Sequence, residues 1–310
     1  MKHCTKESIR FCSADGETQA AGYFYTPISA KIKGVIQISH GMCEYVGRYE
    51  PMIDVLTAQG YAVCGNDHLG HGDTSPDCYG FFAEKNGYQL LLEDLDTMNR
   101  LARSKYPGCK LILFGHSMGS FFARWYAEKN PEAMDALVLS GTGGPGFLMQ
   151  FGKGLACVLS AIRGPRYISK FMVKASTGSY SRGIEDSGSP SVWLSRDPAV
   201  WAAYDQDPKC TFSFTVSAYR DLLTAHTHVN TRDWAQRMRK DLPVYLYSGD
   251  KDPVGNYGKG VRAVYDLLME AGVEDVTLRL YPGGRHEMHN ETNREEVFQD
   301  LISWCDMRLS

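Results

Sequence analysis

The sequence predicts an α/β fold, in which a mostly parallel central sheet carries helices on both faces. Short apolar runs typical of buried strands alternate, along most of the 310 residues, with longer segments whose apolar residues recur at helical spacing. Such alternation favours parallel pairing, because each helix returns the chain to the edge of the sheet where the next strand begins. The alternation lapses between residues 142 and 241, where irregular helical stretches indicate an inserted, mainly helical segment.

The predicted elements follow a regular order on both sides of this insertion. A strand hairpin that turns at Asp15-Gly16 opens the chain, and Pro107-Gly108 ends its long amphipathic helix. The predicted strands cover residues 8–12, 21–25, 34–39, 61–66, 110–114, 136–140, 243–248 and 276–281. The predicted helices cover residues 48–59, 87–106, 121–130, 257–270 and 292–307.

The insertion divides the chain into three segments. We expect residues 1–141 to form the first part of an α/β core, residues 142–241 the insertion, and residues 242–310 the second part of the core. The most apolar stretch of the insertion, residues 147–162, is interrupted by polar side chains and glycines. It is therefore suited to contact a lipid surface transiently, but not to cross a membrane.

Composition and charge indicate which partners and which cellular compartment to expect. The chain has 33 basic and 36 acidic residues, a net charge of −3 and no long run of one sign, so no nucleic-acid partner is expected. No apolar stretch follows Lys2, so no secretory signal is predicted. Nine scattered cysteines without a C-x-x-C pair favour free thiols in a reducing compartment, which predicts a cytoplasmic protein. Nothing indicates an obligatory protein partner.

One short stretch carries a chemical signature. The apolar run that begins at Leu111 ends in Gly115-His116-Ser117-Met118-Gly119 and passes directly into a helix. This G-x-S-x-G pattern is typical of a sharp strand-to-helix turn that projects a serine hydroxyl, and a side chain at either glycine would collide with a neighbouring strand or helix. The sequence therefore predicts that Ser117 is a nucleophile.

A nucleophilic serine needs a base, and the base works better when a carboxylate orients it. In an open α/β sheet these groups lie on loops at the carboxyl ends of strands, in the chain order serine, acid, histidine. The loop after residues 243–248 offers Asp250 and Asp252, and the loop after residues 276–281 offers His286 and His289. Other acidic and histidine residues, chiefly Asp67, His68 and His71, precede Ser117, so the chain order favours the later loops.

Several loops together resemble those of the α/β-hydrolase superfamily. They cover residues 40–41, 67–72, 115–119, 249–254 and 282–289. Within this superfamily, the run from His40 to Tyr49 resembles the oxyanion-loop stretch of the monoglyceride lipase and bacterial lysophospholipase group of serine aminopeptidase-like hydrolases. The likeness covers the chain except for the insertion, which in this family is a variable cap. The resemblance thus implies an α/β-hydrolase fold, with residues 142–241 as its cap.

The resemblance also implies roles for individual residues. By position, the family's acid falls on Asp252 and its base on His286, with Asp250 and His289 as alternates. The oxyanion hole falls on the backbone N–H groups of Met42 and Met118. No metal or organic cofactor is implied. His40, His68, His71 and His116 are expected to have structural roles, and Cys43 is expected to be a small buried side chain.

Two other patterns do not fit the sites that they resemble. Residues 141–146 match G-x-G-x-x-G after a strand, but Pro145 and the lack of an acid about twenty residues on argue against a dinucleotide site. His286 and His289 flank a glutamate but are three residues apart, whereas the zinc-protease motif H-E-x-x-H places its histidines four apart.

The sequence thus predicts a serine hydrolase that cleaves a small-molecule acyl ester through an acyl-enzyme. The subgroup implies monoacylglycerol or lysophospholipid substrates. One alternative is a prolyl-aminopeptidase-like peptidase, in which cap carboxylates would hold a free amino group. Another is a non-catalytic ligand-binding protein on a hydrolase scaffold. The candidate amine-binding carboxylates are Glu185, Asp186, Asp197, Asp205 and Asp207.

Overall fold

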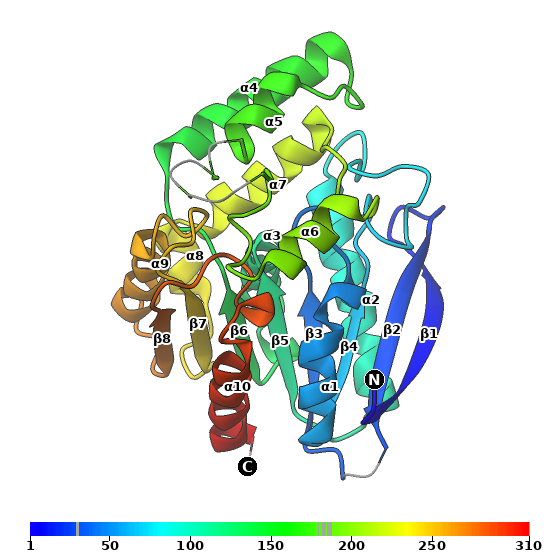
Figure 1. The fold of residues 1–310 in the computed structure, drawn as a ribbon, viewed down its shortest axis with the longest axis vertical. Coiled ribbons are helices and arrows are strands. Elements are labelled where there is room, and N and C mark those ends of the chain that lie inside the picture. The colour runs from blue at the N-terminus through cyan, green and yellow to red at the C-terminus, as the bar shows by residue number, and fades with distance from the viewer. Residues whose placement is uncertain (29–30, 179, 182–183, 185–187, 310) are drawn as a thin grey trace.

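An eight-stranded sheet forms the centre of the molecule, with strand order β1-β2-β4-β3-β5-β6-β7-β8 (Figure 1). The computed structural model describes residues 1–310 except 29–30, 179, 182–183, 185–187 and 310. Strand β2 pairs antiparallel with β1 and β4, and every pairing from β4 to β8 is parallel. The strands are β1 (Cys4–Cys12), β2 (Gln19–Pro27), β3 (Gly34–Ser39), β4 (Tyr61–Asn66), β5 (Leu111–His116), β6 (Ala136–Ser140), β7 (Val244–Gly249) and β8 (Val276–Tyr281).

Helices cover both faces of this sheet, and every residue of β3 to β7 is buried. One apolar core lies under α2 (Gly87–Lys105), α3 (Met118–Lys129) and α9 (Lys259–Glu270). A second core lies under α1 (Glu50–Ala58) and α10 (Arg294–Leu309). Short 3-10 helices η1 (Val46–Tyr49), η2 (Pro131–Ala133) and η3 (Met288–Asn290) complete the connections. The predicted α/β-hydrolase architecture is confirmed.

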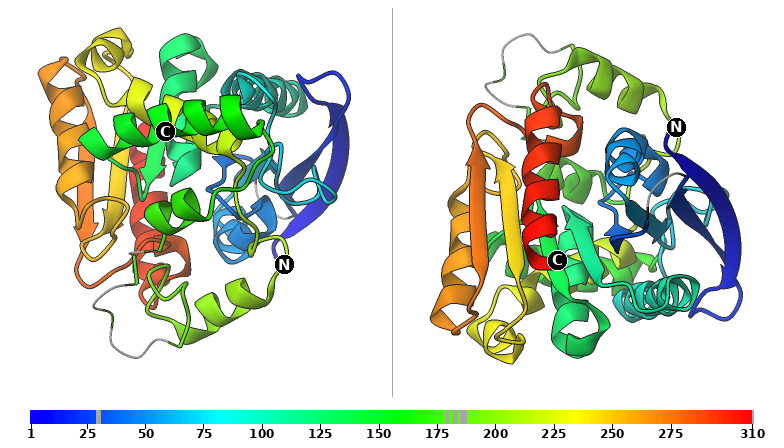
Figure 2. Two further views of the ribbon diagram at one scale, coloured as in Figure 1. Left: turned by 90° about the horizontal axis from the view of Figure 1, so that it is seen from above. Right: turned by 90° about the horizontal axis from the view of Figure 1, so that it is seen from below.

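Between β6 and β7, the described residues form five helices. They are α4 (Phe147–Arg163), α5 (Lys170–Ser176), α6 (Pro198–Gln206), α7 (Val216–Val229) and α8 (Arg232–Arg237). Helix α4 packs on α7, and α7 packs in turn on α2 and α3. The view from above shows α4 crossing over the sheet, whereas α10 lies on the opposite side of the molecule (Figure 2). The division at residues 142–241 stays a prediction.

Several element boundaries differ from the predicted ones. Strand β1 begins at Cys4, whereas the predicted strand begins at Ser8. The prediction missed the first residues because they lie on an edge strand, are mostly exposed and lack an apolar pattern. These residues still pair with β2, for instance Thr5 with Thr26. The helix predicted over residues 48–59 is divided into η1 and α1, where Pro51 occupies the first turn of α1.

All nine cysteines are free thiols, as the sequence predicts. Among the residues that the structure describes, no helix combines the length and apolar character needed to span a membrane.

Gly119, in the first turn of α3, is where the helix and strand β3 approach most closely. A Cβ atom there would overlap the backbone carbonyls of Ser39 and His40, which cannot move without disturbing the strand. A Cβ atom at Gly115 would lie 2.7 Å from the Cβ of Ala123. Both glycines of the G-x-S-x-G turn are therefore required by packing, as predicted.

We expect Gly119→Ala to lower the free energy of unfolding by about 1–3 kcal/mol, the range typical of overpacking. The measurement is urea unfolding followed by circular dichroism. Gly154→Ala is the matched control, because Gly154 lies in helix α4 with no neighbour within 4 Å of its missing Cβ. There the change should stabilise the protein by up to about 1 kcal/mol. Equal effects at the two positions would contradict this account of the turn.

Candidate active site

Ser117 lies at the junction of β5 and α3 in a strained backbone conformation. Its φ is 51° and its ψ is −120°, which non-glycine residues rarely adopt. Two contacts hold this turn in place: the Ser117 N–H donates to the Ser140 carbonyl at 2.9 Å, and the Ser120 hydroxyl donates to the Ser117 carbonyl. Such a strained turn is typical of a nucleophile at the carboxyl end of a strand.

The loop after β3 approaches the same turn. A Cβ atom placed on Gly41 would lie 3.1 Å from the Ser117 Cβ, so Gly41 packs directly beside the serine. Met42 follows in this loop, and Met118 begins helix α3. Among the described residues, neither the Met42 N–H nor the Met118 N–H donates to a protein group. Two uncommitted backbone donors therefore belong to the two segments that meet at Ser117.

Asp252 and His286 form a buried hydrogen-bonded pair at the ends of β7 and β8. The His286 Nδ1 lies 3.0 Å from the Asp252 Oδ2, and the two side chains are 3% and 0% exposed. The Ser248 hydroxyl and the Val254 N–H also donate to Asp252. With Nδ1–H donating to the carboxylate, Nε2 is left as the basic nitrogen.

The charge of Asp252 governs the protonation of His286. Burial lowers the pKa of His286, but the attraction and hydrogen bond of Asp252 outweigh burial, with smaller contributions from Glu287 and Glu44. The pKa of His286 is therefore raised above its ordinary value. The imidazole ring lies 4.7 Å, centroid to centroid, from the ring of His116, the residue before Ser117. The structure thus brings the loop of His286 next to the turn of Ser117.

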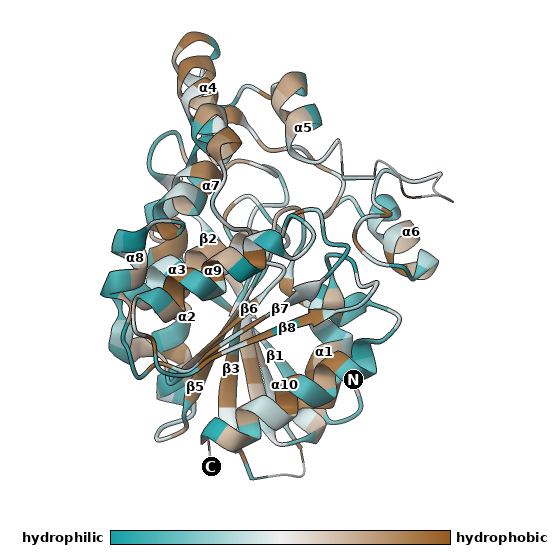
Figure 3. Cartoon of the chain, turned by 90° about the vertical axis from the view of Figure 1, so that its left-hand side faces the viewer, coloured by the Kyte–Doolittle hydropathy of each residue, from teal (hydrophilic) through white to brown (hydrophobic). Residues whose placement is uncertain are grey.

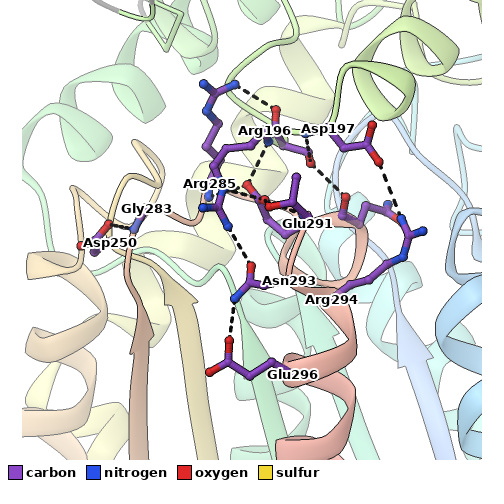
Figure 4. Close-up of polar contacts among 12 residues, drawn as sticks. Arg196, Asp197, Asp250, Gly283, Arg285, Glu291, Asn293, Arg294 and Glu296 are labelled. Carbon is purple, nitrogen blue, oxygen red and sulfur yellow. Dashed lines mark hydrogen bonds and ion pairs between the residues drawn. The ribbon is translucent and has the colours of Figure 1, made fainter.

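The two alternate residues have other partners. Asp250 accepts the Gly283 N–H at 2.8 Å and so bonds to the start of the loop that carries His286 (Figure 4). His289 stacks on Tyr49 at 4.4 Å, and burial lowers its pKa to about 3. The geometry therefore favours Asp252 and His286 as the acid and the base.

A buried ionic cluster behind the site is absent from the sequence predictions. Both terminal nitrogens of Arg48 donate to the Glu287 carboxylate, at 2.5 and 2.7 Å. Arg48 also donates to Glu44, which accepts the Gly41 N–H and the Tyr49 hydroxyl. Burial raises the pKa of Glu44, in spite of the nearby Arg48. The only sequence signal was the spacing of Glu44 and Arg48, four residues apart; Glu287 lies far along the chain.

Family comparison agrees with this geometry. The family described as "Serine aminopeptidase, S33" matches residues 30–293. The chain belongs to this family. It is an α/β-hydrolase of the monoglyceride lipase group. Monoacylglycerol lipase from Mycolicibacterium smegmatis is 30% identical over 281 residues, which are 89% of each chain. Monoglyceride lipase from Rattus norvegicus is 25% identical over 301 residues, covering 96% of this chain and 90% of the lipase.

A solved structure extends the likeness to three dimensions. The thermostable carboxyl esterase from Bacillus coagulans in complex with glycerol superposes with a TM-score of 0.93. It is 30% identical and covers 99% of both chains. The likeness therefore includes the insertion, the part for which the sequence motifs were least informative.

His40, His68 and His71 form a buried cluster in this α/β-hydrolase. His40 and His68 pack with ring centroids 4.3 Å apart, and the His68 N–H donates to His40 Nε2. Burial lowers the pKa of His68 to about 3 and that of His71 to about 4, so both rings are neutral at pH 7. Among the described residues, no group of histidine, cysteine or acidic side chains is arranged to hold a metal ion.

Cys43 is buried in the loop that follows β3. Its sulfur faces the Phe212 carbonyl at 3.4 Å, and burial raises the pKa of its thiol well above the ordinary value. This environment fits the predicted small buried side chain. In the glycine-rich loop 141–146, Gly144 packs closely against α9: a Cβ atom there would lie 2.7 Å from the Cα of Gly260.

The insertion's carboxylates are mostly committed to protein groups. Asp205 accepts two serine hydroxyls, those of Ser189 and Ser191. Asp207 accepts the Tyr45 hydroxyl at 2.8 Å, and Asp197 caps helix α6. The remaining two candidates for holding a substrate amine, Glu185 and Asp186, lie outside the described residues.

Proposed function

We propose that this α/β-hydrolase cleaves carboxylic esters through an acyl-enzyme, with Ser117, His286 and Asp252 as its catalytic triad. The observation that carries the proposal is the buried Asp252–His286 pair, which a ring contact with His116 places beside the strained turn of Ser117. The similarity to lipases and an esterase supports the same reaction class.

The reaction has two steps. The Ser117 Oγ attacks the ester carbonyl carbon while His286 Nε2 accepts its proton, and the imidazolium then protonates the departing alcohol oxygen. In the second step, water attacks the acyl-enzyme, His286 accepts a proton from the water, and that proton returns to Ser117 as the acid leaves. Asp252 stabilises the imidazolium, whose pKa is raised by this carboxylate against the effect of burial.

The N–H groups of Met42 and Met118 form the proposed oxyanion hole. Both are uncommitted among the described groups and lie on the segments that meet at Ser117. Fixed donors stabilise the negative oxygen that exists only in the tetrahedral intermediate, and each contributes about 2.7–4 kcal/mol in other serine hydrolases. Glu44 supports this hole, because it accepts the N–H of Gly41 immediately before Met42.

The proposed substrates are monoacylglycerols or lysophospholipid-type acyl esters. Two similar proteins are monoglyceride lipases, and the insertion carries an exposed apolar helix, α4, that is suited to contact an acyl chain or a lipid surface. A prolyl-aminopeptidase-like activity is disfavoured, because Asp197, Asp205 and Asp207 are already bound to other groups. A non-catalytic binding role does not require the buried Asp252–His286 pair. A cytoplasmic location stays a prediction.

We expect the purified protein to hydrolyse monoacylglycerols and nitrophenyl esters, with no comparable turnover of proline anilides. Hydrolysis is followed by product release across a panel that also contains lysophosphatidylcholine. Ser117→Ala should abolish turnover and labelling by a fluorophosphonate probe, while the fold, followed by circular dichroism, is unchanged. A preference for the anilide would overturn the esterase proposal, and an unlabelled wild-type serine would favour the binding role.

We expect kcat/KM to rise with pH through the pKa of His286, because only the neutral imidazole can accept the serine proton. That pKa is raised, so the midpoint of the pH profile should lie above 6.5. In Asp252→Asn the negative charge that raises the His286 pKa is lost while burial still lowers it, so the midpoint should fall. Maximal turnover should drop by about 10⁴-fold. Asp250→Asn is the matched control and should leave the midpoint unchanged. The opposite pattern would identify Asp250 as the acid.

We further propose that the insertion touches lipid transiently through its apolar surface. Large apolar side chains are exposed along α4 and α5, and α4 shows hydrophobic colouring over much of its length (Figure 3). Phe147 is 85% exposed and Phe151 62% exposed. The surface consists of Phe147, Leu148, Phe151, Val158, Ile162, Ile168 and Phe171.

Replacing both Phe147 and Phe151 by serine should lower hydrolysis of monoacylglycerol embedded in phosphatidylcholine vesicles several-fold, because less apolar area enters the lipid surface. Hydrolysis of a soluble short-chain ester should not change. Met307→Ser is the control, since Met307 is 68% exposed on α10, at the opposite end of the molecule from α4. Equal losses on vesicles and on the soluble ester would refute a lipid contact.

A further inference from the structure

The loop that carries His286 is bonded to one segment of the insertion, residues 192–197. Four consecutive carbonyls of this segment accept hydrogen bonds from the loop. A terminal nitrogen of Arg285 donates to the carbonyls of Val192 and Ser195, at 2.6 and 2.9 Å. The N–H groups of the next two residues donate to the carbonyls between them: His286 to Trp193 at 3.3 Å and Glu287 to Leu194 at 2.7 Å.

Glu291 completes this connection from inside the protein. Its side chain is fully buried, and it accepts the Arg196 N–H and Nε–H at 2.9 Å each. It also accepts the Arg285 N–H at 3.0 Å, so one carboxylate bonds the insertion and the base loop together. Figure 4 shows Arg196, Arg285 and Glu291 meeting above the first turn of α10, where Arg196 also reaches Asn293.

Segment 192–197 places the side chain of Trp193 next to His286. The indole ring lies 5.0 Å from the imidazole of His286, centroid to centroid, with the planes 37° apart. His286 is 2% exposed, whereas Trp193 is partly exposed, so the indole lies on the solvent side of the base. A base covered in this way keeps its orientation, and its bond to Asp252 is shielded from water.

We propose that Arg285 and Glu291 are positioning residues that fasten segment 192–197 to the base loop and so hold Trp193 against His286. The proposal rests on the assignment of His286 as the catalytic base. It divides the insertion in function: segment 192–197 stays with the core, whereas α4, which packs on α7, is free of this connection. Any opening of the insertion then leaves Trp193 in place.

The first test compares kcat and KM for a nitrophenyl ester, with active sites counted by fluorophosphonate labelling. Arg285→Met removes the donor to two carbonyls, and Glu291→Gln places an amide against donors of Arg196 and Thr292. We expect kcat per labelled site to fall about 10- to 100-fold while KM changes little, because the base is misplaced rather than the substrate released. Arg285→Lys keeps a charged donor and should recover most of the loss.

Asp94→Asn is the matched control. Asp94 is also a buried carboxylate that accepts two protein donors, those of Ser13 and Ala14, but it lies on α2. Its replacement should leave kcat per labelled site unchanged, even if the protein is less stable. Trp193→Ala should reproduce the loss of Arg285→Met, and the double variant should be no worse than the poorer single variant. Additive losses would overturn the role given to Trp193.

Hydrogen exchange provides a test that does not depend on turnover. In Glu291→Gln, peptides covering residues 190–197 and 284–291 should exchange about tenfold faster, whereas the peptide of α4 should not change. Unchanged exchange in the first two peptides, or equal acceleration throughout the insertion, would overturn the proposal. If the wild-type serine is not labelled, the proposed function fails, but the exchange result still decides whether this connection exists.

Discussion

The close approach of α3 to β3 is the constraint on which the site depends. It is possible only because Gly119 has no side chain to meet the carbonyls of Ser39 and His40. That contact fixes the start of α3 against the end of β3, and between β5 and α3 the chain must turn through the strained conformation of Ser117. The strain is maintained by the packing around it, which is how such conformations persist at functional sites. The serine, the Met118 N–H and the Gly41 loop are thereby placed by one packing contact.

Three carboxylates hold the loop of His286, the proposed base, and each bonds to different groups. Asp252 bonds to the imidazole itself and raises its pKa against the effect of burial. Glu287 binds Arg48, Arg48 also binds Glu44, and Glu44 accepts the Gly41 N–H in the loop after β3. Glu291 bonds the loop to the insertion. The loop of His286 is therefore bonded to Asp252 after β7, to the loop after β3 and to the insertion, so all three set its position.

The sequence predicted the fold because strands β3 to β8 are short apolar runs between helices, a local pattern that can be read without the structure. It also singled out Ser117 and the loops after β7 and β8, since each follows a strand in a fixed chain order. Within those loops the family resemblance, not the chain order, selected Asp252 and His286. The structure bonds these two residues and brings the His286 ring against His116, the residue before Ser117. It did not predict Arg48 with Glu287, or Arg196 with Glu291. These pairs are separated by 239 and 95 residues, and nothing local distinguishes their members from solvated charges. The exposed start of β1 was missed for a related reason, because its pairing with β2 leaves no apolar pattern.

The insertion therefore contacts the rest of the protein in two ways: α4 by apolar packing on α7, and segment 192–197 by hydrogen bonds to the loop of His286. Helix α4 packs on α7 and exposes apolar side chains. These side chains make no hydrogen bonds, so the exposed face of α4 can leave water for a lipid surface without breaking any. Segment 192–197 is joined to the base loop by directional bonds to four successive carbonyls and to a buried carboxylate, and separating it would leave these groups unpaired. Movement should therefore concentrate in the apolar part, while the bonded part keeps the geometry of His286. The proposed lipid contact uses the first of these arrangements, and the proposed positioning of Trp193 against His286 uses the second.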